Sequence, residues 1–220
     1  MRWKWRWNIA QFAERRWWQS YLKNKDVQEY LSWKKQYWQK IIDLCKPYFT
    51  IVSTDVILDA GCGPAGMFML FPDHKTIAFD PLLDRYESDL PHFKKKFYPN
   101  TEFVSAGLED FIAPQQVDKI FCMNAINHVQ DIELSFDKLV SFGKPGSYLI
   151  ITIDAHNHSF FKHVFRLLPG DILHPHQYDL KEYQSLITNR GYNMLASIHV
   201  KHEFFFDHYI LIAQKTISTN

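Results

Sequence analysis

The segment Asp55–Gly66 constrains this chain more than any other, because an apolar run breaks there into an acid and three glycines. Val56–Leu58 carries the bulky apolar side chains of a buried parallel strand. Gly61 and Gly63 can adopt positive φ, and without a Cβ they let a ligand lie directly on main-chain N–H groups. We therefore expect a strand that ends in a ligand-binding turn, with the Asp59 carboxylate facing the ligand.

Two glycine-rich patterns could explain such a turn. A phosphate-binding P-loop is excluded because no Gly-Lys-Ser/Thr ending follows the glycines. The second pattern is the dinucleotide turn, which matches as Gly61-x-Gly63-x-x-Gly66. An acid about twenty residues further on can accept both hydroxyls of a ribose, and Asp80 ends the apolar segment Ile77–Phe79 at that spacing. An ordinary βαβ unit with a tight turn and no ligand is the alternative.

Residues Leu58–Gly66 resemble motif I of the class I S-adenosylmethionine-dependent methyltransferases. Three later segments, Ile77–Asp80, Phe103–Phe111 and Val117–Val129, follow in this family's order and spacing. The resemblance covers residues 50–215 and implies an α/β fold, in which an antiparallel C-terminal hairpin completes a Rossmann-like, seven-stranded, mostly parallel sheet. It also implies S-adenosylmethionine as the cofactor.

The resemblance implies cofactor contacts along the turns that follow the strands. They fall on Asp59, Gly61, Cys62, Gly63, Asp80, Pro81, Gly107, Leu108 and Asn124. The chain departs from the family at Gly107, where many members place an acid that accepts from the adenine amino group. The contact with the adenine amino group must therefore come from another residue, with Glu109 as the candidate, or be absent. The main-chain N–H of Leu108 stays available for the adenine.

Composition limits the architecture and the compartment. With 220 residues and 46% hydrophobic content, the chain can form one domain with a sizeable core plus an extension. Its three cysteines are odd in number and form no C-x-x-C pair, which favours a reducing compartment. No apolar run of about 18 residues and no signal-peptide segment is present, so we expect neither a membrane span nor secretion but a cytoplasmic protein.

The N-terminal segment differs from the rest of the chain. Residues 1–40 hold ten Lys/Arg against three Asp/Glu, and all seven tryptophans lie there. Helical spacing of apolar residues predicts one helix from about Asn8 and a second from Asp26, which can act as an N-cap, to just before Pro47. We interpret residues 1–46 as a helical aromatic lid, with Tyr37 and Trp38 as substrate contacts, on a methyltransferase domain formed by residues 47–220.

Two other interpretations of this lid stay open. Aromatic and basic helices can lie in the headgroup layer of a membrane, so residues 1–25 could make peripheral membrane contact. Basic and aromatic side chains can also bind single-stranded nucleic acid.

The remaining elements are expected in the alternating order of a parallel α/β sheet. We expect strands at residues 76–80, 101–105, 119–123, 147–153, 192–200 and 204–214, helices at 67–71, 132–142 and 180–189, a broken helix at 82–98 and a turn at 144–146.

Histidines supply the candidates for acid–base chemistry. Ile126–His128 is similar to the Leu-His-His of the ubiquinone/menaquinone-methyltransferase-like branch, with Asn127 in place of the first histidine. His128 is therefore a candidate general base, although a histidine there could simply order the loop. A substrate-side insert is expected at residues 155–178. It adds the candidate bases His174 and His176 and the pocket residues His156, His158 and Tyr178. The His-x-His pairs suit metal ligands, but a pocket role is preferred and no metal site is expected.

The expected function is methyl transfer by in-line displacement to a small-molecule or lipid-like acceptor, with a histidine suited to the role of base. The chain lacks the Asn/Asp-Pro-Pro-Tyr tetrapeptide of enzymes that methylate amino groups of bases and the Pro-Cys pair of cytosine-C5 enzymes, so a DNA substrate is not expected. Two alternatives are a catalytically silent cofactor-binding module recruited by the Trp-rich arm and an RNA methyltransferase guided by the basic arm.

Overall fold

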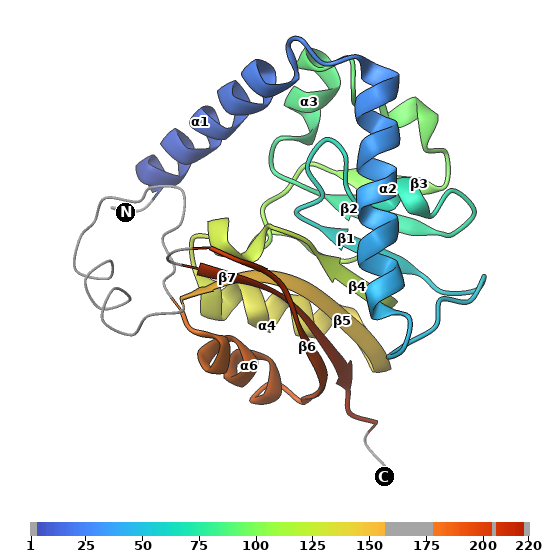
Figure 1. The fold of residues 1–220 in the computed structure, drawn as a ribbon, viewed down its shortest axis with the longest axis vertical. Helices are drawn as coiled ribbons and strands as arrows, with labels where there is room; N and C mark the ends of the chain where they lie inside the picture. Colours follow the sequence, from blue (N-terminus) through green and yellow to red (C-terminus); the bar gives the residue numbers. More distant parts are fainter. Residues whose placement is uncertain (1–3, 157–177, 204–205, 218–220) are drawn as a thin grey trace.

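The computed structural model describes residues 4–156, 178–203 and 206–217. One sheet organises this part of the chain, with strand order β3-β2-β1-β4-β5-β7-β6. Its strands are β1 (Ile57–Ala60), β2 (Thr76–Phe79), β3 (Thr101–Val104), β4 (Val117–Cys122), β5 (Gly143–His156), β6 (Tyr192–His202) and β7 (Phe206–Lys215). The first five run parallel, whereas β7 is antiparallel to both β5 and β6. The expected Rossmann-like sheet with an antiparallel hairpin, its last strand beside β5, is confirmed (Figure 1).

The helices surround this sheet close to their predicted positions. They are α1 (Lys4–Leu22), α2 (Val27–Cys45), α3 (Leu83–Asp89), α4 (Ile132–Phe142) and α6 (Leu180–Thr188), with 3₁₀ turns at Met67–Leu70, Lys95–Phe97 and Ile126–His128. Asp26 caps α2 as predicted, because its carboxylate accepts from the N–H groups of Gln28 and Glu29. The predicted helix at residues 82–98 is broken, since α3 ends at Asp89 and a 3₁₀ turn follows.

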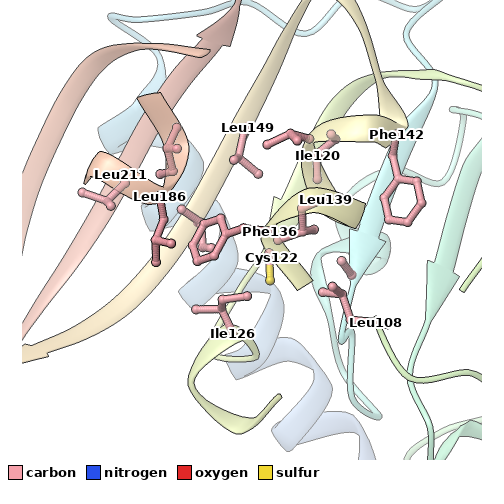
Figure 2. Packing of buried hydrophobic residues seen from close by; sticks show 14 of the residues in the cluster. Leu108, Ile120, Cys122, Ile126, Phe136, Leu139, Phe142, Leu149, Leu186 and Leu211 are labelled. Atoms are coloured by element: carbon pink, nitrogen blue, oxygen red, sulfur yellow. The ribbon is translucent and has the colours of Figure 1, made fainter. Parts of the chain in front are cut away.

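Both faces of the sheet are buried, as a parallel sheet requires. Neighbouring residues of β1 point to opposite faces: Leu58 packs with α4 and α6, whereas Ile57 packs with α2. Figure 2 shows the first of these cores, where Phe136 and Leu139 of α4 lie among side chains from the strands. The second core includes Trp38, Ile41, Ile42 and Cys45 of α2. Helix α2 is therefore an integral part of the packed domain.

One predicted turn lies inside a strand. The turn expected at residues 144–146 is an irregularity within β5, which already pairs with β4 at Gly143 and resumes pairing at Tyr148. Gly146 has φ +81°, a backbone conformation that favours glycine. The glycine and proline signal was therefore correct about a local deviation, whereas the expected start of the strand at Ser147 was wrong.

Helix α1 lies beside the sheet rather than on it. In Figure 1, α1 and α2 form the two sides of an inverted V, and the C-terminal half of α1 lies next to α3. Several of its large apolar side chains are exposed, including Ile9, Phe12 and Trp17. Within the described residues, no helix is both long and apolar enough to cross a membrane.

Candidate active site

A cavity of about 700 Å³ opens at the carboxyl ends of β1, β2 and β4. The turns that follow these strands and β3 form what we call the floor, which comprises residues 61–65, 80–81, 107–109, 123–125 and 128–129. The cavity-lining side chains of α1 form the roof. They are Trp7, Gln11, Ala13, Glu14, Trp17, Trp18 and Tyr21. Residues of α2 close one side. Ligands of open α/β sheets bind at this edge.

The glycine turn has the backbone that its sequence predicts. Gly61 and Gly63 have φ of +66° and +57°. The N–H groups of Gly61 and Cys62 both donate to the carbonyl of Phe79 on β2, at 2.8 and 3.1 Å. A Cβ on Gly61 would lie 2.4 Å from the Cβ of Ala125, so only glycine fits there. At Gly63 the nearest atom to such a Cβ is 3.8 Å away, on the roof residue Trp18.

Asp80 joins two turns of the floor. One carboxylate oxygen accepts from the N–H of Gly63 at 3.0 Å and the other from the N–H of Leu82 at 2.8 Å. Each oxygen of an ionised carboxylate can accept about two hydrogen bonds, so each keeps capacity for a ligand hydroxyl. Burial, followed by the charge of Glu14, raises the pKa of Asp80 to about 7. This arrangement fits a ribose with two neighbouring hydroxyls.

Asp59 lies behind the cavity rather than in it. Its side chain is 1% exposed, it does not line the cavity, and its carboxylate accepts from the N–H of Phe68 at 2.9 Å. A Cβ on Gly66 would lie 2.4 Å from the same carboxylate. Burial raises its pKa to about 7. The expectation that this carboxylate faces the ligand is therefore not supported, and Asp59 instead holds the glycine loop.

Gly107, Leu108 and Glu109 form the part of the floor that follows β3. One oxygen of Glu109 accepts from the N–H groups of Gln130 and Asp131, at 2.7 and 3.2 Å. The other oxygen lies 3.6 Å from the position of a Cβ on Gly107. Glu109 therefore brings a fixed carboxylate close to Gly107, the position where many family members have an acid and this chain has none. Pro81 and Cys62 also line the cavity.

The turn after β4 brings Asn124 and His128 to the cavity. Asn124 has φ +54°, and its backbone and side chain both bond the Thr152 hydroxyl, at 2.6 and 2.9 Å. His128 is exposed and lines the cavity, and its backbone N–H donates to the carbonyl of Ala125. Asn127 points away into the core, where its amide oxygen accepts from the Tyr183 hydroxyl at 3.0 Å. Of the two polar residues in Asn127-His128, only His128 lines the cavity.

The roof contributes residues that the sequence analysis missed. Glu14 of α1 lies above the floor and accepts from the Tyr86 hydroxyl at 3.4 Å and from Trp18. Burial raises the pKa of its carboxyl group. Trp18 packs edge-on against Tyr86, with ring centroids 6.2 Å apart. A signal was present, because Glu14 is the lone acid among the first 25 residues.

Lys34 of α2 is a second residue that the sequence analysis missed. It lines the cavity, and its ammonium lies 4.4 Å from the Trp38 ring centroid and 5.2 Å from that of Tyr37. Burial lowers its pKa to about 8, against the opposing effect of the Asp59 charge. A cation inside a partly buried aromatic site suits a ligand carboxylate.

The expected substrate contacts and the remaining candidate bases lie in different places. Trp38 lines the cavity and donates its indole N–H to the carbonyl of Ala65 at 2.8 Å. Tyr37 and Tyr178 do not line it. The Tyr37 side chain is hydrogen-bonded to Asn124, and the Tyr178 ring packs on Tyr183. His156 is the last residue of β5. Three predicted histidines, His158, His174 and His176, lie outside the described residues.

Comparison with known proteins gives three findings. The model of a protein family described as "methyltransferase domain" matches residues 51–205. No curated protein matches the sequence. Solved structures of similar fold include the YcgJ protein of Bacillus subtilis, with TM-score 0.65 and 14% identity over 83% of this chain and 99% of that one.

Two further structures share this fold. The [4+2]-cyclase SpnF has TM-score 0.62 and 12% identity over 81% of each chain. Magnesium protoporphyrin IX methyltransferase of Synechocystis, crystallised with S-adenosylhomocysteine, has TM-score 0.61 and 14% identity over 94% of this chain and 95% of that one. At these identities the likeness establishes the fold alone.

Proposed function

The chain belongs to the methyltransferase domain family, whose methyl donor is S-adenosylmethionine, and we propose that it methylates a small organic acceptor held between α1, α2 and the floor. One observation carries this proposal: a single cavity of about 700 Å³ is lined by both the glycine turn with Asp80 and the aromatic side chains of α1 and α2. Cavities of this size, mostly apolar with a few fixed polar groups, are typical of small-molecule sites.

The floor and α2 offer partners for the ribose hydroxyls, the adenine and the carboxylate of the cofactor. Asp80 would accept from the ribose hydroxyls, because both its oxygens keep acceptor capacity. Glu109 would accept from the adenine amino group, and the N–H of Leu108 would donate to the ring. Lys34 would pair with the cofactor carboxylate. Because Gly61 and Gly63 have no side chains, they leave the main-chain N–H groups of the turn uncovered for contact with the cofactor.

The roof and α2 would position the acceptor. Trp17, Trp18 and Tyr21 of α1 and Trp33 and Trp38 of α2 all line the cavity, which suits a flat or aromatic acceptor. S-adenosylmethionine supplies an electrophilic methyl group on a sulfonium with a neutral leaving group. The chain's part is to align the acceptor and exclude water, and orientation of this kind can supply roughly 7–11 kcal/mol.

His128 is the described residue best placed to take a proton from the acceptor. It lines the cavity on the same turn as Asn124, and this turn is held by the hydrogen bond from the backbone N–H of Asn124 to the Thr152 hydroxyl. The ordinary pKa of a histidine lies near neutrality, and a base of this type adds about 10²–10⁴-fold to the rate. An acceptor whose reacting group ionises readily would need it less.

We further propose that the lid is α1 alone. The sequence assigned residues 1–46 to the lid, but the apolar side chains of α2 pack into the core with strands of the sheet. The exposed Ile9 and Phe12 on the outer side of α1, together with the basic residues of this helix, favour a second role in peripheral membrane contact.

Methyl transfer can be tested by following S-adenosylhomocysteine release from S-adenosylmethionine with phenols, quinols, thiols and lipids as acceptors. We expect turnover with at least one class, its loss in Asp80→Ala, and its loss after removal of residues 1–25. If the truncated and full-length proteins both bind cofactor, neither turns over, and only the full-length chain binds anionic vesicles, the protein is a recruited, catalytically silent module. Affinity for RNA that falls steeply with salt would instead favour an RNA substrate.

A further inference from the structure

Three metal-ligating side chains meet at the turn of the β6–β7 hairpin, away from the cavity. They are His199 and His202 of β6 and Asp207 of β7, which we call the hairpin cluster. One imidazole nitrogen from each histidine and one carboxylate oxygen lie within 4.8 Å of one another. In the sequence, only the His-x-His pairs near residues 156 and 174 have a spacing that suggests metal ligands, so this cluster was not predicted.

A β-bulge brings the two histidines to the same face of the sheet. Residues three apart on a regular strand point to opposite faces, because side chains alternate with period two. Here the register of β6 against β7 shifts between His199 and Lys201. His199 pairs with Tyr209 and His202 pairs with Asp207. Tyr209 and Asp207 are two apart on β7 and share a face, so both histidines share it as well. Bulges often re-aim side chains at functional sites.

Asp207 already connects the two imidazoles. The same carboxylate oxygen lies 2.5 Å from Nδ1 of His202 and 3.4 Å from Nε2 of His199. The histidine side chains are 69% and 48% exposed, whereas that of Asp207 is 18% exposed. Asp207 is therefore the fixed member of the cluster, and the two imidazoles have room to rotate around its carboxylate.

The geometry points to a binding site for one divalent transition-metal ion, such as Zn²⁺ or Co²⁺, formed by His199, His202 and Asp207. Two imidazoles and one carboxylate suit these ions, whereas Mg²⁺ and Ca²⁺ prefer oxygen ligands alone. Bonds of about 2.0–2.2 Å place tetrahedral ligand atoms roughly 3.3 Å apart. The widest separation between these ligand atoms, up to 4.8 Å, must therefore shrink by up to about 1.5 Å, which exposed side chains can achieve by rotating. Three protein ligands leave at least one position for water or a further ligand.

The site lies at the same edge of the sheet as the cavity. Strand β5 runs parallel to β4, so its end at His156 lies at the carboxyl edge, and His156 pairs with Phe206 beside the hairpin turn. The bound ion would link β6 to β7 where the hairpin turns. Methyl transfer from a sulfonium needs no metal, so we assign the ion to the hairpin and not to the reaction.

The opposite face of the hairpin supplies a matched control. His208 is adjacent in sequence to Asp207, points to the other face, and its imidazole pairs with Asp154 of β5. His208→Asn therefore removes one histidine from the same hairpin and leaves all three proposed ligands in place.

Metal binding is tested on the full-length, untagged, chelator-treated protein by calorimetric titration with Zn²⁺ and by the visible absorption of bound Co²⁺. We expect one ion per chain in the wild type and in His208→Asn. His202→Asn and Asp207→Asn should weaken binding by at least about tenfold, because even loss of an outer-shell partner costs about 10- to 100-fold. Thermal melts without metal check that each variant folds.

Three results would overturn the proposal. They are no binding by the wild type, binding that His202→Asn and Asp207→Asn leave intact, and binding that His208→Asn weakens as much as they do. The second result would place the ion at other histidines of the chain.

Discussion

The floor of the cavity is built from turns at the ends of parallel strands, whereas its roof is one helix that lies beside the sheet. In the floor, main-chain N–H groups fix Asp80 from two turns, and Gly61 packs against Ala125 with no room for a Cβ. In the roof, α1 is held by few polar contacts. Arg15 and Gln19 both bond Asp89, at 2.6 and 3.0 Å.

This difference between floor and roof predicts that changes in the two regions have different effects. A change in the floor disturbs backbone that is continuous with the core, so it should affect folding and cofactor affinity together. A change in the roof should leave the fold intact and alter the ligands that α1 covers. Four predictions test this difference between the floor and the roof, from the largest expected effect to the smallest.

The largest effect is expected from Gly61→Ala. A non-glycine residue at positive φ costs about 1–2 kcal/mol, and the new Cβ would lie 2.4 Å from that of Ala125, where overpacking adds about 1–3 kcal/mol. The free energy of unfolding, measured with denaturant, should fall by about 2–5 kcal/mol in total, and cofactor binding should be lost. Gly146→Ala is the control, because Gly146 also has positive φ but meets its nearest side chain at 3.6 Å, away from the cavity. Equal losses in the two variants would contradict the tight fit at Gly61.

The second prediction concerns the pH dependence of stability. Burial raises the pKa of Asp80 to about 7 in the folded protein, against about 3.9 when unfolded. The folded state therefore holds a proton that the unfolded state has released, and stability falls as pH rises between these values. From about pH 5 to pH 7, wild type should lose about 2–3 kcal/mol relative to Asp80→Asn. Denaturant unfolding of both proteins across this range measures it, and parallel pH profiles would count against a buried, protonated Asp80.

The third prediction compares the inner and outer sides of α1. Trp18 lines the cavity over Gly63, so Trp18→Ala should weaken cofactor binding by up to about tenfold, since a packed aromatic contact contributes about 0.5–1.5 kcal/mol. Phe12 is 55% exposed and does not line the cavity, so Phe12→Ala should leave affinity unchanged. Calorimetric titration measures both. Similar affinities for the two variants would mean that α1 does not cover the cofactor.

The smallest effect is expected from Asp89→Asn, which removes the ion pair between α3 and Arg15 of α1. Pairs near the surface contribute little to stability, so thermal unfolding should barely change. KM for the acceptor should rise, because the roof opens more readily. Asp84→Asn is the matched control. Asp84 is on α3 like Asp89, but it pairs at the surface with Lys95 of the following 3₁₀ turn and not with α1. A rise in KM of equal size in the control would show that the Arg15–Asp89 pair does not hold the roof.

The floor could be predicted from the sequence because its determinants are local. The apolar segment before Asp59 forms β1, and Gly61 and Gly63 adopt the positive φ that their pattern predicts. Asp80 ends a neighbouring strand, so topology alone brings it to the glycine turn. The direction of the Asp59 side chain was not predictable, because it depends on how tertiary packing places the N–H of Phe68, in the 3₁₀ turn at Met67–Leu70, against the end of β1.

The helix that forms the roof was predicted, but the place of Glu14 in it and the hairpin cluster were not, because tertiary geometry creates both. Glu14 has its position only because α1 packs along α3 and meets Tyr86. His199 and His202 share a face only because β6 is bulged between His199 and Lys201. Regular alternation along the strand would have placed these two histidines on opposite faces.

The most direct test of the floor-and-roof account is calorimetric titration of the protein with S-adenosylhomocysteine and S-adenosylmethionine, repeated on Asp80→Ala and on the chain without residues 1–25. Above pH 7, where Asp80 is ionised, hydrogen bonds to its charged carboxylate contribute about 1.5–3 kcal/mol each. Loss of two of them should weaken binding by at least about 100-fold in Asp80→Ala, while the truncated chain should bind more weakly but measurably. Equal affinity of wild type and Asp80→Ala, or no binding by a well-folded wild type at millimolar ligand, would contradict the account.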